Sequence, residues 1–118
     1  MRALAPNDEV PVREAQVGID DVKAEAILEL IPESQAPCPP SRISSQSVPV
    51  VFQNKRDSKV TLVWVDAAGR HHERKSMAGA TRHLVQTYSG HAWLVLDENG
   101  KALGHFIIGD EAAEAPIQ

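Results

Sequence analysis

All five aromatic residues of this 118-residue chain lie in the stretch from Phe52 to Phe106, and that stretch contains no proline. Six of the eight prolines precede residue 41. Aromatic side chains supply much of the buried area of a core, whereas proline interrupts the interiors of helices and sheets. One hydrophobic core is therefore expected between about residues 45 and 109. A chain of this length has no room for a second core of useful size.

Charge and cysteine content exclude several classes of protein. The net charge of −4 argues against nucleic-acid binding, which needs clustered lysine and arginine to neutralise phosphates. The single cysteine, Cys38, cannot form an internal disulfide and has no neighbouring histidine or acid in the sequence to activate it. The N-terminus lacks the apolar core of a signal peptide, and no apolar run approaches the roughly 18 residues that span a bilayer. A cytoplasmic location, away from membranes, is expected.

Residues 1–44 are expected to lie outside the compact domain. Apolar residues between 19 and 31 recur at helical spacing, Asp20 can cap a helix there, and Pro32 would end it. This pattern predicts a short amphipathic N-terminal helix over about residues 20–31, followed by a linker rich in proline and serine. At the other end, residues 110–118 are acidic and are expected to form a solvated tail.

Between these segments the hydrophobic pattern changes to the period of two that is typical of strands. Turn residues separate short β-branched or aromatic runs, and Asn99-Gly100 is a strong hairpin signal. Pro49, near the start of the first run, suggests an edge strand. The expected strands cover residues 48–54, 59–66, 70–75, 82–87, 91–96 and 102–108. The prediction is an all-β fold, a small antiparallel β-sandwich of about six to seven strands over residues 45–109.

One turn decides which side chains meet. A three-residue loop at 88–90 would pair Thr87 with His91 and place Trp93 on the same face of the sheet. A two-residue loop would turn Thr87 away from His91. A hydroxyl, an imidazole and an indole on one face would suit a small ligand with polar and apolar parts, and Trp64 could add a second indole wall. The alternative, in which both tryptophans are core packing and His91 bonds a carbonyl, stays open.

No metal, cofactor or catalytic site is expected. His71 and His72 are adjacent in sequence, but neighbours on a strand point to opposite faces and cannot hold one ion together. A nucleophile elbow, a phosphate-binding loop and a metal-binding helix motif are all absent from the sequence. The chain is therefore expected not to be an enzyme.

The segments VFQN, KVTLVWVDAAG and TYSGHAWLV, which lie between residues 51 and 95, resemble the β domain of the von Hippel–Lindau tumour suppressor family. The most specific part is Tyr-x-Gly-His-x-Trp at residues 88–93, and the likeness covers about residues 45–109. The resemblance implies a β-sandwich, in agreement with the strand pattern.

In that family the β domain binds an extended peptide that carries 4-hydroxyproline. The resemblance implies that the hydroxyl of Thr87 and the imidazole of His91 bind the hydroxyproline OH. It implies aromatic walls from Trp64 and Trp93, and it places Tyr88 beside the pocket.

Two features depart from the family. The tyrosine that contacts the peptide backbone falls on Arg74, which can still donate to a carbonyl or stack on an indole. Since the sequence ends at Gln118, the helical domain that recruits elongin for a ubiquitin ligase is not expected, and neither is a role as a ligase adaptor. We therefore expect a non-enzymatic module that binds an extended protein or peptide, with a prolyl-hydroxylated peptide as one candidate. The alternative is a structural or oligomerisation module that uses the sandwich and the N-terminal helix, so a homo-oligomer stays open.

Overall fold

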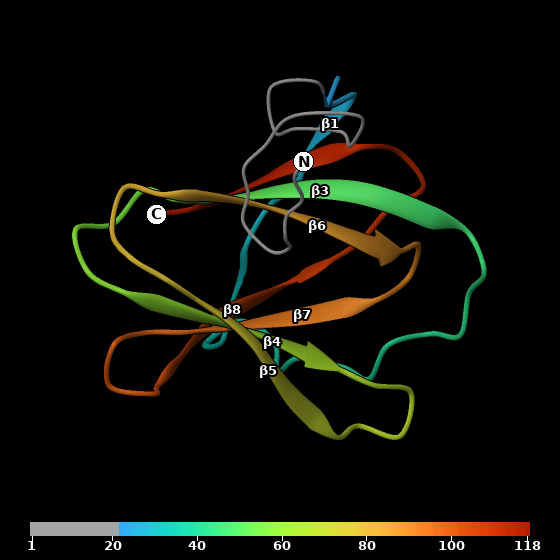
Figure 1. The fold of residues 1–118 in the computed structure, drawn as a ribbon. Helices are drawn as coiled ribbons and strands as arrows, with labels where there is room; N and C mark the ends of the chain where they lie inside the picture. Colours follow the sequence, from blue (N-terminus) through green and yellow to red (C-terminus); the bar gives the residue numbers. More distant parts are fainter. Residues whose placement is uncertain (1–21) are drawn as a thin grey trace.

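A computed structural model describes residues 22–118, which form two β-sheets stacked face to face (Figure 1). The strands are β1 (Ala26–Ile27), β2 (Ile31–Pro32), β3 (Ser47–Asn54), β4 (Val60–Val65), β5 (His71–Met77), β6 (Arg82–Tyr88), β7 (Ala92–Leu96), β8 (Ala102–Ile107) and β9 (Ala113–Ile117). One sheet has the order β1-β9-β3-β6 and the other the order β2-β8-β7-β4-β5. The described residues contain no helix, and hence none with the length and apolarity needed to cross a membrane. The predicted all-β sandwich is confirmed.

Strands β3 to β8 coincide with the six expected strands to within two residues at each end. Asn99-Gly100 closes the β7–β8 hairpin as predicted, with Gly100 at φ +81° donating its N–H to the Asp97 carbonyl at 3.0 Å. Gly69, at φ +85°, donates in the same way to the Asp66 carbonyl at 2.9 Å and joins β4 to β5. Local turn chemistry therefore sets these two hairpins.

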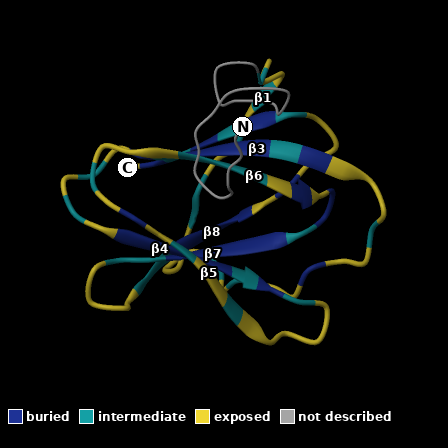
Figure 2. Ribbon diagram, viewed as in Figure 1, coloured by how far each residue is buried: buried dark blue, intermediate teal, exposed yellow. Residues whose placement is uncertain are grey.

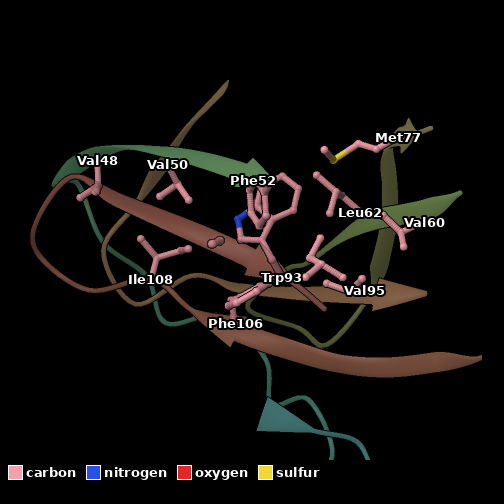
Figure 3. Close-up of a cluster of buried hydrophobic side chains, with 12 residues drawn as sticks. Val48, Val50, Phe52, Val60, Leu62, Met77, Trp93, Val95, Phe106 and Ile108 are labelled. Atoms are coloured by element: carbon pink, nitrogen blue, oxygen red, sulfur yellow. The ribbon is translucent and has the colours of Figure 1, made fainter. Parts of the chain in front are cut away.

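Alternate residues of the central strands point inward and fill the space between the sheets (Figure 3). Those of β3 are Val48, Val50 and Phe52, each at most 1% exposed. The Phe52 ring packs against Trp93 with ring centroids 5.5 Å apart, and against Phe106 at 5.9 Å. Figure 2 shows much of β3, β4 and β7 buried, whereas the turns and most of β5 are exposed. One core therefore joins three aromatic rings to an aliphatic layer, and Trp93 belongs to it.

The C-terminal segment is a strand of the sandwich, which corrects the expectation of a solvated tail over residues 110–118. β9 is an inner strand that pairs in parallel with β1 and β3. Its inward residues Ala113, Ala115 and Ile117 are all 0% exposed. Two of these three are alanines, which carry little hydrophobic signal, and a parallel partner that is distant in sequence leaves no turn motif. For these two reasons the sequence pattern did not predict β9.

The short helix expected over residues 20–31 is also corrected. Residues 20 and 21 lie outside the described part of the chain, and from residue 22 onward the backbone contributes β1 and β2 in place of a helix. Leu28 and Leu30 pack against the core from this segment, whereas Ile27 is 73% exposed. The apolar residues therefore follow a period of two here. The physical reason is that an extended segment can cover an open edge of each sheet, while a helix of about three turns is marginal on its own.

β3 is an inner strand and not the edge strand that Pro49 suggested. It pairs with β6 from Ser47 to Gln53, but with β9 only from Val50 onward. Pro49 thus lies just before the β9 ladder begins. One side of the strand is still free of a partner strand at that point, so the missing N–H of proline is tolerated.

Residues 38–41 run along the outer face of the sheet that contains β4 and β7. Ser41 is 5% exposed, and its hydroxyl donates to the Val65 carbonyl and accepts the N–H of Ala92 at 2.7 Å. This one side chain bridges β4 and β7 at the last pair of their ladder. Burial raises the pKa of the Cys38 thiol to about 11, so the thiol stays protonated. Cys38 packs against the outward-facing cluster of Val63, Val65, Ala92 and Leu94.

Candidate functional site

Thr87 and Trp93 stand on different sheets. β6 pairs with β3, whereas β7 pairs with β4 and β8. The segment between β6 and β7 therefore crosses from one sheet to the other, and the expected hairpin between them is wrong. At the crossing, Gly90 donates its N–H to the Ile108 carbonyl at 2.7 Å. This anchor ties the crossing to the end of β8.

The crossing nevertheless gathers the hydroxyl, the imidazole and one of the indoles singled out from the sequence. Trp93 Nε1 donates to Thr87 Oγ1 at 3.0 Å, and a longer contact of 3.4 Å joins Thr87 Oγ1 to His91 Nδ1. An indole N–H can only donate, so the threonine oxygen accepts from Trp93 and its own proton is left for His91. His91 then carries its ring proton on Nε2, and that N–H is the donor it can offer to a ligand.

Burial sets the protonation of this group. It lowers the pKa of His91 below its ordinary value of 6.5, so the ring is neutral at pH 7 and Nδ1 remains an acceptor. Thr87 is 2% exposed and Trp93 5% exposed, so both belong to the interior. His91 is partly buried and is the member of the three that lines a cleft.

Trp64 lies on β4 between two histidine rings. It is the cross-strand partner of Trp93 on β7 and of His72 on β5. Its ring centroid is 5.0 Å from that of His72 and 5.4 Å from that of His91, with interplanar angles of 30° and 26°. Stacked rings at such distances attract one another. The indole is therefore held from both sides of β4.

The carboxylate of Asp66 holds the His72 ring in position. Asp66 Oδ2 lies 2.8 Å from His72 Nε2, and Asp66 Oδ1 accepts the backbone N–H groups of Ala68 and Arg70 at 2.9 and 2.8 Å. These hydrogen bonds, that of His72 first, lower the pKa of Asp66 below its ordinary value. The carboxylate is therefore ionised at neutral pH and accepts a hydrogen bond from the Nε2–H group of His72.

Arg74 lies apart from the other expected site residues. The β4–β5 ladder pairs Leu62 with Lys75 but Val63 with Glu73, so Arg74 is the extra residue of a bulge. Arg74 is exposed, and no ring contact joins it to the indole of β4 among residues 22–118. The structure thus does not place it in the wall that the family tyrosine would form.

A cleft of about 380 Å³ opens beside Trp64 and His91. Its other lining residues come from two segments, 41–44 and 66–68, and Ile43 among them is 90% exposed. Tyr88 is 40% exposed, and its ring centroid lies 5.3 Å from that of His91. Binding clefts for small ligands span roughly 300–1,000 Å³, so this one is large enough for one or two residues of a peptide.

Sequence reasoning missed Ser41, Asp66 and His72 as parts of this site. The sequence pointed to His72 only as a candidate metal ligand, and that role was not expected because neighbouring residues on a strand point to opposite faces. The signal that could have found it is the hairpin register. Trp64 and His72 stand at equal distances from the centre of the β4–β5 turn, which makes them cross-strand partners.

A β-sandwich that presents an indole and an imidazole beside an open cleft has the form of a binding domain. The model of a known family, the VHL beta domain, matches residues 40–103, which is more than half of the chain. The chain therefore belongs to the VHL β-domain family, whose β domain is a non-enzymatic protein-binding domain. The match includes every expected site residue, whereas β1, β2 and β9 lie outside it. No curated protein matches the chain.

Proposed function

We propose that this protein is a module that binds an extended peptide carrying proline, prefers the 4-hydroxylated form, and does not transform its ligand. The proline ring would pack against the part of the Trp64 indole that lines the cleft, and the ligand hydroxyl would accept a hydrogen bond from the Nε2–H group of His91. The observation that carries the proposal is the series of contacts from Trp93 through Thr87 to His91, because it makes His91 a donor toward the cleft.

The stacked arrangement around Trp64 supports the binding of a proline ring. The indole lines the cleft, and the rings of His72 and His91 already hold it in place. A wall that is ordered before binding loses little side-chain entropy when the ligand arrives. The proline ring is itself rigid and apolar, so the contact suits both partners.

The protonation state of His91 supports discrimination between proline and hydroxyproline. Its Nε2–H has no hydrogen-bond partner among the described residues, and burial keeps the ring neutral. A hydroxyl on the ligand would satisfy this donor, whereas a proline ring would not. One net hydrogen bond contributes about 0.5–1.5 kcal/mol, which corresponds to a preference of roughly two- to tenfold.

The test begins with an array of acetylated nonapeptides that carry 4-hydroxyproline at the centre, and with the matched proline array. Calorimetric titration of the full chain with the best binder and its proline twin then gives the two affinities. We expect the hydroxylated peptide to bind more tightly. Equal affinities would contradict the hydroxyproline preference, and no binding to either array would contradict the proposal as a whole.

A matched pair of variants locates the preference. His91→Phe keeps an aromatic ring next to Trp64 but removes the donor, so it should bind both peptides with similar affinity. His71→Phe makes the same change at an exposed position of β5, and it should keep the wild-type preference.

A further inference from the structure

We infer that His72, held by Asp66, is a specificity-determining residue of this site and accepts a hydrogen bond from the main chain of the peptide beside its proline. This inference rests on the proposed function. It gives the peptide backbone a partner in His72, which accepts from an N–H group, in place of the contact to a carbonyl that the family resemblance would give to Arg74.

His72 lies where such a contact is possible, and Arg74 does not. The imidazole stacks on Trp64 with centroids 5.0 Å apart, and its side chain is 41% exposed, so a ligand on the indole can reach it. Arg74 falls in the bulge of β5, outside the pairing with β4. His72, two positions earlier in the sequence, is the cross-strand partner of Trp64 and lies next to the indole.

Asp66 decides which ring atom of His72 is available. An ionised carboxylate can only accept, so His72 must carry a proton on Nε2. Nδ1 has no hydrogen-bond partner among the described residues. In the neutral ring this nitrogen is therefore a free acceptor. The turn holds the carboxylate through two backbone N–H groups, so the ring cannot easily rotate to exchange its two nitrogens.

The acceptor constrains the ligand. Proline has no N–H, so the N–H that reaches His72 must come from a neighbouring residue of the peptide. β5 is the outer strand of its sheet in the described part of the chain, so an extended peptide on Trp64 has room to run beside it. The ligand class is thus an extended peptide with an unsubstituted backbone amide next to its proline.

The experiment combines variants of the full chain with N-methylated peptides. The binder found in the array is made with a methyl group on the backbone nitrogen of the residue before or after hydroxyproline. One of these two analogues should bind the wild type roughly five- to tenfold more weakly. His72→Phe keeps a ring on Trp64 but lacks Nδ1, so it should weaken the unmodified peptide by a similar factor and show no further loss with that analogue.

The control is Arg74→Ala, which should leave the affinity for every peptide within twofold of the wild type. His72→Gln retains an acceptor oxygen and should recover part of the loss, which a merely structural role of His72 would not produce. Asp66→Asn should weaken binding, because an amide can donate to His72 and so let Nε2 become the acceptor.

Two results would overturn the inference. One is that the losses from His72→Phe and from N-methylation multiply, which means that they affect different contacts. The other is that Arg74→Ala weakens binding while His72→Phe does not. In both cases a wild-type preference for hydroxyproline leaves the proposed function intact, whereas failure of the wild type to bind either array contradicts both.

Discussion

Trp93 Nε1 donates to Thr87 Oγ1 at 3.0 Å although the two residues stand on different sheets. Both residues are nearly inaccessible to solvent, so water does not compete for this bond. The same hydroxyl lies 3.4 Å from His91, the residue that faces the cleft. Packing between the sheets therefore sets the geometry of the candidate site. A substitution of Thr87 or Trp93 in the core should change how His91 is held in the cleft.

Replacing Thr87 with valine should lower the free energy of unfolding by about 1–3 kcal/mol, as measured by urea titration. Valine fits the space but leaves the Trp93 N–H buried without an acceptor. The change should also reduce the preference for hydroxyproline, because His91 loses the hydroxyl that fixes its tautomer. Thr87→Ser keeps the hydroxyl and should retain that preference. Identical unfolding midpoints for the valine variant and the wild type would contradict a stabilising role for the bond.

Ser41→Ala should destabilise the protein by about 1–3 kcal/mol. The serine hydroxyl joins the Val65 carbonyl to the Ala92 N–H, and its removal leaves both groups of the β4–β7 ladder end without that partner. Ser45→Ala, at an exposed position four residues later, is the control and should change stability by less than about 0.5 kcal/mol. Chemical denaturation of the two variants side by side measures the difference. Similar losses at both positions would count against the bridge.

His83 should make stability depend on pH. Burial, and then the nearby positive charge of Lys75, lower the pKa of His83 from 6.5 to about 4. The unfolded chain therefore binds a proton that the folded chain does not between these two values, so stability falls as pH drops from about 7 toward 4. Since His83 is only partly buried, we expect a loss on the order of 1–2 kcal/mol.

The measurement is urea unfolding at several pH values with His83→Gln beside the wild type. The variant cannot titrate, so its stability should vary less over this range. His71→Gln makes the same change at an exposed position of β5, and it is the control for the general effect of replacing a histidine with glutamine. Parallel profiles for His83→Gln and the wild type would refute the assignment.

Gly104→Ala should detach β2 from β8. A Cβ at this position would lie 2.3 Å from the Ile31 carbonyl oxygen, which is backbone and cannot move aside without breaking the pairing. Hydrogen exchange should show lost protection at Glu33, whose N–H donates to the Leu103 carbonyl at 3.2 Å. Gly109→Ala is the matched control, because nothing lies within 4 Å of its Cβ position. Unchanged protection in Gly104→Ala would show that the segment adapts.

Local signals made the six strands β3 to β8 predictable. Turn residues such as Asn99-Gly100, with alternating apolar residues on both sides, act over a few positions and can be recognised in a single sequence. The proximity of Thr87, His91 and Trp93 was also predicted, but for the wrong reason. A hairpin was expected to join them, whereas they meet where the chain crosses between sheets.

The remaining features depend on contacts that a local pattern does not carry. The bulge at Arg74 leaves that residue without a partner on β4, while the register set by the β4–β5 turn places His72 beside Trp64. No feature of the sequence near Arg74 marks the bulge. The pairing of β9 with β1 and β3 joins segments far apart in the chain, and it determines whether residues 113–117 are tail or core.

The central position of β9 also bears on how the protein is made. Ribosomes deliver a chain from its N-terminus, so β4, β5, β7 and β8 can pair with one another as they emerge. β3 must wait with one flank open until residues 113–117 have been synthesised. During that interval an apolar strand that carries Val50 and Phe52 is available to chaperones or to other nascent chains. We expect the cellular yield of this small domain to depend on how quickly that flank is covered.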